Sequence, residues 1–348
     1  MFTTGHVFRV GVTLLVAVAG ARSLAAQNWG DEHSALTAGP QYARSKAICR
    51  RLGDLDPPQA DRPTPVQSKA LKGCDSEKLY YGDGGKPDYG KARQCAFIEA
   101  DGADDQIFGG STILMQVYAN GLGVKRNLDV ATAYACNLDG AAAESDGRVL
   151  HLQALKTKPG RFDYCDDITS GLAEGYCQSR ASDRTKIGRD ARLRAMTATL
   201  PASAKPLYLP MKKAFDAFVD AHGDGEVDLS GTARAALEIQ EQDSVRDQFV
   251  KDLARLLSGN WPPAAGSDAR ATDAAMNASY RKALVWAAGK DNYSTIKPED
   301  IRTAQRAWLV YRDAYVRFGL AAAPKIGADA TLARLTKLRT AQLDGLVE

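Results

Sequence analysis

The stretch "IRTAQRAWLVYRDAYVRFG" (301–319) has the pattern of an amphipathic helix with two polar exceptions. Apolar residues recur every three or four positions and form one stripe: Ile301, Ala304, Trp308, Tyr311, Tyr315 and Phe318. At about 100° per residue, Gln305 and Arg312 point into this apolar face. Because a half-buried guanidinium needs acceptors, the helix is expected to pack against a neighbour that supplies polar partners.

Helical patterns occupy the whole second half of the chain. They cover residues 208–221, 229–258, 270–288, 298–318 and 327–345. Gly-rich and Pro-rich turns separate them, and no run of alternating apolar and polar residues indicates a strand. The predicted fold class is all-α, and residues 201–348 are predicted to form an antiparallel helical bundle.

The first half contains an internal repeat. Residues 79–102 and 115–140 each run from a Tyr through a Gly-rich turn to an Asp and a helix that carries a Cys. Aligning the two Asp–Cys pairs places the cysteines Cys95 and Cys136 41 residues apart. Such a period predicts stacked helical hairpins, in which Asn127 or Asp129 caps the second helix of its hairpin.

The segment "VYANGLGVKRNLDVATAYACNLDGAA" within this repeat resembles a Sel1-like repeat, and the resemblance covers roughly residues 70–160. It implies an α-solenoid of Sel1/TPR-like hairpins over 27–160 that binds other proteins and has no catalytic role. A structural platform without a partner of its own is the alternative, because stacked hairpins need only each other for stability.

Six cysteines lie before residue 178 and none lies after it. No CxxC pair occurs and His is scarce, so disulfides are a better interpretation than a metal site. Cys165 and Cys177 are predicted to pair within a connector spanning 161–200. The other four allow three pairings, of which Cys49–Cys74 with Cys95–Cys136 is slightly favoured.

Residues 1–26 have the features of a signal peptide. Arg9 precedes an apolar run at 10–21, and small residues then predict cleavage after Ala25 or Ala26. The run is short for a membrane span, although an N-terminal anchor is the alternative. Removing Arg9 and Arg22 lowers the formal net charge from +3 to +1. We expect a periplasmic or secreted protein that has no membrane span and, lacking basic runs, binds no nucleic acid.

The segments 271–288 and 300–314 resemble the LprI-type lysozyme inhibitor domain over about 268–319. The residues that carry the resemblance are Asp273, Met276, Asn277, Tyr280, Gln305, Trp308, Tyr311, Arg312 and Asp313. Family members commonly have a Cys just after the Arg–Asp pair, where this chain has Ala314, Tyr315 and Val316. The resemblance implies a protein that blocks lysozyme-type muramidases.

The candidate site comprises Asp273, Asn277, Gln305, Trp308 and Arg312. Asp273 and Asn277 share a helix face, so we expect Asp273 to accept from Arg312 and Asn277 to bond Gln305, with Trp308 covering the pair. In the alternative, Trp308 and Arg312 are exposed and contact a protein partner.

The sequence gives weaker support for a metal site or a catalytic site. "DAHGDGEVDLSG" (220–231) faintly resembles a calcium loop but has Gly231 where a bidentate Glu is needed, so an acidic turn is favoured. No standard catalytic motif is present, and no catalytic residue, cofactor or metal is predicted. The leading hypothesis is an exported muramidase inhibitor. The alternative is a periplasmic Sel1-repeat scaffold that binds a partner without inhibiting it; an enzyme acting on peptidoglycan is a third, weaker hypothesis.

Overall fold

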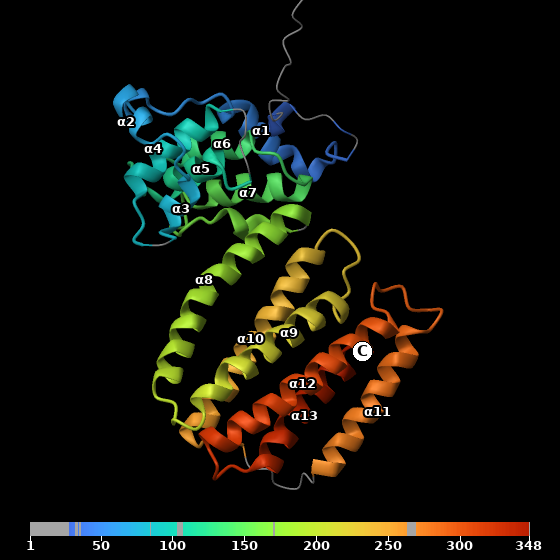
Figure 1. Ribbon diagram of the computed structural model, residues 1–348. Helices are drawn as coiled ribbons and strands as arrows, with labels where there is room; N and C mark the ends of the chain where they lie inside the picture. The colour runs from blue at the N-terminus through green and yellow to red at the C-terminus, as the bar shows by residue number, and fades with distance from the viewer. Residues whose placement is uncertain are drawn as a thin grey trace, which may run out of the picture. The chain divides into compact units, whose positions relative to one another are not determined.

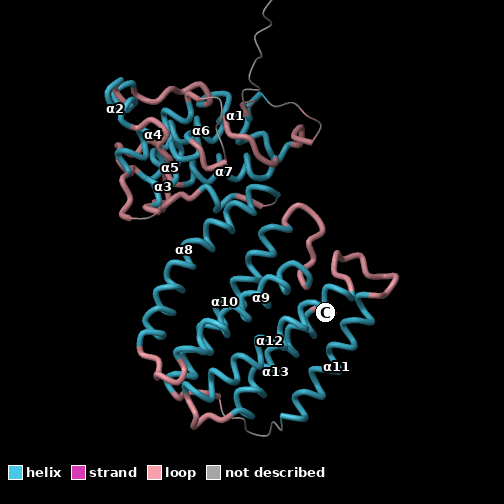
Figure 2. Tube along the Cα trace, in the orientation of Figure 1, coloured by secondary structure: helices cyan, strands magenta, loops and turns pink. Residues whose placement is uncertain are grey.

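A computed structural model describes residues 28–31, 34, 36–83, 85–102, 107–169, 171–262 and 269–347. The predicted signal peptide, residues 1–26, lies outside these. All regular elements in the described ranges are helices, which confirms the all-α prediction (Figures 1 and 2). In the same ranges, no helix is both long and apolar enough to cross a membrane. The chain divides into two compact units, Met1–Asp163 and Tyr164–Glu348.

The first unit is a succession of short helices. They are α1 (Ala43–Leu52), α2 (Pro65–Ala70), α3 (Ser76–Tyr81), α4 (Tyr89–Ala100), α5 (Gly110–Asn120), α6 (Leu128–Cys136) and α7 (Ala142–Ala154). Three 3₁₀ turns accompany them: η1 (Trp29–Asp31), η2 (Pro40–Tyr42) and η3 (Gln59–Asp61). From α3 to α7, each helix contacts its successor, as stacked helical hairpins require.

The turns α3–α4 and α5–α6 share one geometry. Gly82 and Gly121 end the first helix of each hairpin at φ 76° and 66°, a left-handed conformation that glycine adopts readily. The amide of Asp88 then donates to the carbonyl of Leu79 (2.9 Å), and the amide of Asn127 donates to that of Tyr118 (3.0 Å).

These equivalent positions correct the alignment made from sequence. Asp88 and Asn127 are 39 residues apart, so the 41-residue period was wrong. Asn127, and not Asp129, caps α6: its side-chain oxygen accepts from the amides of Asp129 and Val130. Asp129 pairs instead with Lys156 on the surface (2.5 Å).

The disulfides are Cys49–Cys136, Cys74–Cys95 and Cys165–Cys177. The last was predicted; it joins the 3₁₀ turn η4 (Tyr164–Asp167) to the next helix of the second unit. The pairing Cys49–Cys74 with Cys95–Cys136 was wrong. Helix α1 packs on α6 and α7, so Cys49 meets Cys136 across 87 residues of chain, a contact that local spacing does not reveal.

Six longer helices are found among the described residues of the second unit. They are α8 (Gly171–Ala198), α9 (Lys205–Gly225), α10 (Arg234–Ser258), α11 (Ala269–Ala287), α12 (Pro298–Ala322) and α13 (Ala328–Gly345). The most extensive packing pairs are α9 with α12, α8 with α10, and α11 with α13 (Figure 1). Much of the predicted connector, 161–200, is therefore a 28-residue helix that packs along α10.

Helix α9 is longer than its sequence pattern predicts. It continues through Asp220, His222 and Asp224 to Gly225, so the first half of the suggested calcium loop is helical. The carboxylate of Asp228 accepts from Ser230 and Thr295 and orders the turn that follows. The backbone therefore does not have the shape of a calcium loop.

The core of this unit is built on the apolar stripe of α12. Trp308, Tyr315 and Phe318 are almost completely buried there. Phe215 of α9 stacks on Phe249 of α10 with ring centroids 4.2 Å apart. Burying a side chain of this size contributes roughly 1.5–3 kcal/mol, so the stripe is a major source of the stability of the bundle.

Candidate functional site

Gln305 lies inside the bundle, as its position in the apolar stripe predicts, but its partners differ from the expected one. It is 6 % exposed. Its carbonyl oxygen accepts from Nε of Arg339 on α13 (2.8 Å), and its amide donates to the Met276 sulfur (3.1 Å). The predicted bond to Asn277 was wrong: Asn277 donates within its own helix, to the backbone oxygen and carboxylate of Asp273.

Arg312 lies nearer the surface. Its Nε and Nη2 donate to Asp313 at 2.9 and 2.8 Å, whereas the expected partner Asp273 is at 4.0 Å, the outer limit of an ion pair. The guanidinium lies 5.3 Å from the centre of the Trp308 ring, so the expected indole–guanidinium contact is present. Trp308 itself is 2 % exposed and is a core residue in this conformation.

The centre of the polar network is Arg339. It donates to both carboxylate oxygens of Glu226 at 2.7 and 2.6 Å, and both side chains are completely buried. Glu226 also meets Nδ1 of His222 (2.7 Å), and Nε2 of His222 meets Glu241 (2.9 Å). With Gln305, one connected network therefore joins α9, α10, α12, α13 and the residue that caps α9.

Sequence reasoning missed Arg339, although a signal exists. Leu335, Arg339 and Leu343 are spaced at i, i+4 and i+8, so the arginine lies on the apolar face of α13. Gln305 was recognised in the same way, as a polar residue on the apolar face of its helix. Neither pattern identifies the partner, which depends on how α12 and α13 pack.

Electrostatic interactions keep this network charged. Burial acts to raise the pKa of Glu226, but the Arg339 charge and hydrogen bonds from Arg339 and His222 hold it below its usual value. Burial acts to lower the pKa of His222, but hydrogen bonds to Glu226 and Glu241 raise it overall. The hydrogen bond from His222 also lowers the pKa of Glu241. These pKa shifts all favour the charged forms of His222, Glu226 and Glu241.

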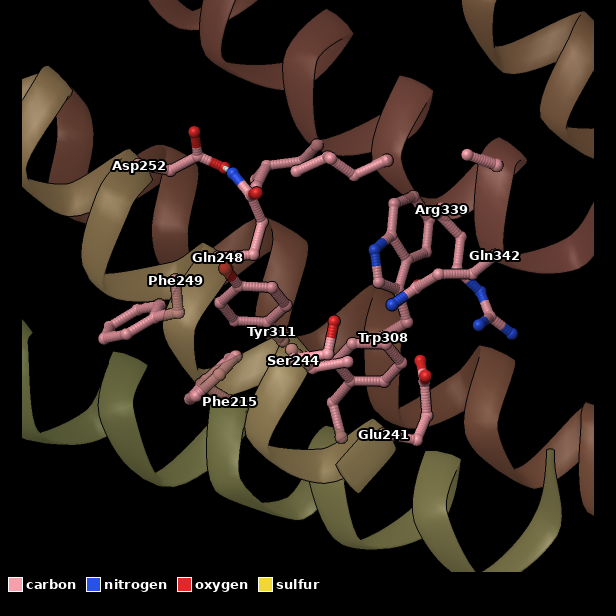
Figure 3. A pocket seen from close by; sticks show the side chains of 15 residues that line it. Phe215, Glu241, Ser244, Gln248, Phe249, Asp252, Trp308, Tyr311, Arg339 and Gln342 are labelled. Atoms are coloured by element: carbon pink, nitrogen blue, oxygen red, sulfur yellow. Dashed lines mark hydrogen bonds between the residues drawn. The ribbon is translucent and has the colours of Figure 1, made fainter. Parts of the chain in front are cut away.

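A groove runs beside this network between α10 and α13. Its deeper part has a volume of about 310 Å³; Phe215, Phe218, Trp308 and Tyr311 of α9 and α12 form its floor. Residues of α10 and α13 form the walls, with Glu241, Ser244, Gln248 and Asp252 on the α10 side (Figure 3). Leu335, Leu338, Arg339, Ala341 and Gln342 line the α13 side.

A second, shallower hollow of about 700 Å³ continues the groove. It shares Glu241, Ser244, Ala341 and Gln342 with the deeper part and extends past His222, Asp228 and Trp286. At the opposite end, Arg334 of α13 reaches across to Asp252 of α10 (3.2 Å). We call the two hollows together the α10–α13 groove.

Asp273 and Asn277 lie outside this groove. They border a separate hollow of about 580 Å³ with Arg270, Arg281 and Leu332. Of the predicted site residues, the structure brings Trp308 to the groove floor and Gln305 to the network beneath it. Asp273, Asn277 and Arg312 form a different cluster at the α11–α12 surface.

The second unit is thus an all-helical domain with a buried ionic network and an aromatic-floored groove. Residues 263–343 match the family model described as lysozyme inhibitor LprI. The match extends beyond the predicted 268–319 and includes most of α13, with Arg339. Neither the curated proteins nor the solved structures contain a significant match to this chain.

Proposed function

We propose that the protein is an exported binding protein that blocks or sequesters a lysozyme-type muramidase, after removal of the signal peptide at residues 1–26. The match of residues 263–343 to the lysozyme inhibitor family carries this proposal. The matched segment supplies one wall of the α10–α13 groove and part of its floor. Three disulfides favour an oxidising compartment, periplasmic or extracellular.

The charges around the groove support binding and not catalysis. A general acid at neutral pH needs a carboxyl group with a raised pKa. The pKa values of Glu226 and Glu241 are instead lowered, mainly by Arg339 and His222. These lowered pKa values favour the ionised forms, and Arg339 and His222 already pair with both carboxylates, so neither is arranged as a general acid.

An acidic surface beside the groove favours a basic partner. Asp220 and Asp224 are exposed on α9, and Glu238 faces them from α10. Burial and the charges of Asp224 and Asp220 raise the pKa of Glu238, so these groups are near enough to repel one another. Such a patch would attract a basic muramidase at short range, whereas the mature net charge of about +1 gives little long-range steering.

The organisation proposed for the chain is a Sel1-like repeat region at 27–160, a disulfide-bearing connector at 161–200 and an LprI-like domain at 201–348. The repeated hairpin turns at Gly82 and Gly121 support the repeat region. In this view the repeats provide a second protein-binding platform, and inhibition belongs to the C-terminal domain.

A turbidity assay tests the proposal. Mature protein at micromolar concentration should slow the clearing of a cell-wall suspension by lysozyme, in proportion to the protein added. Clearing at an unchanged rate would contradict inhibition. Binding to lysozyme without any slowing would favour the non-inhibitory scaffold.

A further inference from the structure

We propose that Tyr293, in the connection between α11 and α12, enters the substrate cleft of the muramidase and takes the place of a sugar ring. This inference rests on the proposed function and names the residue that would carry the inhibition. We call residues 289–297 the α11–α12 loop. The loop lies within the segment 263–343 that matches the lysozyme inhibitor family.

Tyr293 is an aromatic residue that the core of the bundle does not use. It is 89 % exposed, more than any other large hydrophobic residue that the structure describes. The α11–α12 loop that carries it extends beyond the ends of both helices (Figures 1 and 2). Tyrosine is enriched among the residues that dominate binding energy in protein interfaces. The position of Tyr293 therefore suits contact with a partner.

Hydrogen bonds from the residue before Tyr293 hold the loop in one shape. The side-chain amide of Asn292 donates to the carbonyl oxygens of Ala287 (3.2 Å) and Ile296 (3.1 Å). The side-chain oxygen of Asn292 accepts from the backbone amide and the hydroxyl of Ser294 (3.0 and 2.7 Å). Asn292 thus joins the end of α11 to the residues that lead into α12, with Tyr293 between them.

A second set of bonds ties the loop to the turn that follows α9. The backbone amide of Thr295 donates to the carboxylate of Asp228 (3.1 Å), and the hydroxyl of Thr295 accepts from the amide of Leu229 (2.7 Å). Ile296, the next residue, is buried in the core. Because the loop is already ordered and a tyrosine has only two side-chain torsions, fixing Tyr293 in a partner costs little conformational entropy.

The shape and chemistry of this loop suit a cleft that binds sugar rings. Substrate clefts are concave, and the α11–α12 loop is a projection that can enter one. A tyrosine ring has apolar faces and a polar hydroxyl, as a sugar ring has an apolar face and hydroxyl groups. The polar groups of Asn292 and Ser294 bond within the loop, so they do not compete with Tyr293 for the cleft. A ring held there would keep the glycan from the catalytic carboxyl groups.

Substitution of Tyr293 tests this assignment without disturbing the core. Tyr293→Ala should weaken the inhibition of lysozyme by the mature protein about tenfold or more, measured as the concentration that halves the rate of cell-wall clearing. Tyr293→Phe keeps the ring and should retain more of the inhibition. The matched control is Val285→Ala, which removes another exposed apolar side chain of the matched segment and should inhibit as the wild type does. Because both positions are exposed, the three variants should keep the wild-type melting temperature.

Competition with a sugar tests whether the contact lies in the cleft. Saturating lysozyme with chitotriose, a trisaccharide that fills the cleft, should weaken the binding of the wild-type protein about tenfold or more, measured by calorimetry. If the wild type inhibits, equal inhibition by Tyr293→Ala, or equal binding to free and saturated lysozyme, would overturn the role of Tyr293 and leave the proposed function standing. A wild type that neither binds nor slows lysozyme would overturn both.

Discussion

Arg339 and Glu226 form a bidentate ion pair across 113 residues of chain, and neither side chain is exposed to solvent. The side-chain oxygen of Gln305 accepts a hydrogen bond from the Nε–H of the guanidinium. The low local dielectric strengthens the attraction within such a pair. If one partner is lost, the desolvation cost of the other buried ion is no longer compensated. The stability of the second unit should therefore depend strongly on both members being present.

Replacing Arg339 by Met should lower the free energy of unfolding of the second unit by about 3–5 kcal/mol, because the buried Glu226 loses its bidentate partner and keeps only His222. Urea denaturation followed by circular dichroism measures this. Arg302→Met, at an exposed position of α12, is the control and should change stability by less than about 0.5 kcal/mol. Adding Glu226→Gln to Arg339→Met should recover part of the loss; an additive loss would contradict the pairing.

Gln305 and Arg312 should differ sharply in their effect on stability. Gln305→Ala removes a buried acceptor of Arg339 and should cost about 1–3 kcal/mol. Arg312→Ala should cost no more than about 1 kcal/mol, because its closest partner, Asp313, is mostly exposed. Thermal melts of the two variants measure the difference. A larger loss for Arg312→Ala would mean that the α11–α12 cluster, and not the buried network, holds the helices together.

The stability of the second unit should decline at both ends of the pH range, along an alkaline limb and an acidic limb. The titratable groups of the buried network cause both limbs. The folded-state pKa of His222 lies above 6.5, so its contribution is complete below pH 6.5 and is lost as the pH rises through the folded value. The folded-state pKa values of Glu226 and Glu241 lie below 4.5, so their contribution is present above pH 4.5 and is lost as the pH falls through them.

Melting temperatures between pH 3 and 9 would check both limbs, with His222→Gln as the comparison. This variant should flatten the decline on the alkaline side and reduce the acidic limb to the part that Arg339 provides through Glu226. A wild-type protein that becomes more stable as the pH rises above 6.5 would show that His222 is neutral in the folded state.

The disulfides should differ in their contributions according to the loops they close. Cys49–Cys136 closes 87 residues and Cys165–Cys177 closes 12. The chain-entropy estimate gives about 4–5 kcal/mol for the first and about 3 kcal/mol for the second. Denaturation of the paired Cys→Ser variants measures each loss. Mass spectrometry of unreduced peptides checks the connectivity, and a Cys49–Cys74 peptide would refute it.

The cap of α6 offers a test of the repeat register. Asn127→Ala removes the acceptor of two backbone amides and should destabilise the first unit by about 1 kcal/mol. Asp129→Ala removes a surface ion pair and should cost less than about 0.5 kcal/mol. Chemical denaturation of both variants compares them. Equal losses would favour the 41-residue alignment.

Local periodicity predicted much of this fold, because each helix carries its own apolar stripe. The stripe of α12 is buried as predicted, and Gln305 was recognised as a polar residue inside it. Its partner could not be predicted. Gln305 and Arg339 are 34 residues apart and meet only because α13 packs against α11 and α12.

The dependence on contacts between distant parts of the chain also explains the other wrong predictions. Cys49 meets Cys136 because α1 folds back onto α6. The groove is formed by residues of α9, α10, α12 and α13, none of which has a distinctive motif in the sequence. Spacing within a helix follows from its geometry, whereas these contacts follow from how complete helices assemble.

The long separation between Glu226 and Arg339 also bears on how the second unit folds. Closing a loop of 113 residues carries a high entropic cost before the ion pair returns any energy. The carboxylate of Glu226, which caps α9, would therefore have only its local partner His222 until α13 docks. The docking of α13 would then be a late kinetic step, at which water leaves the centre of the bundle and the native state becomes cooperative.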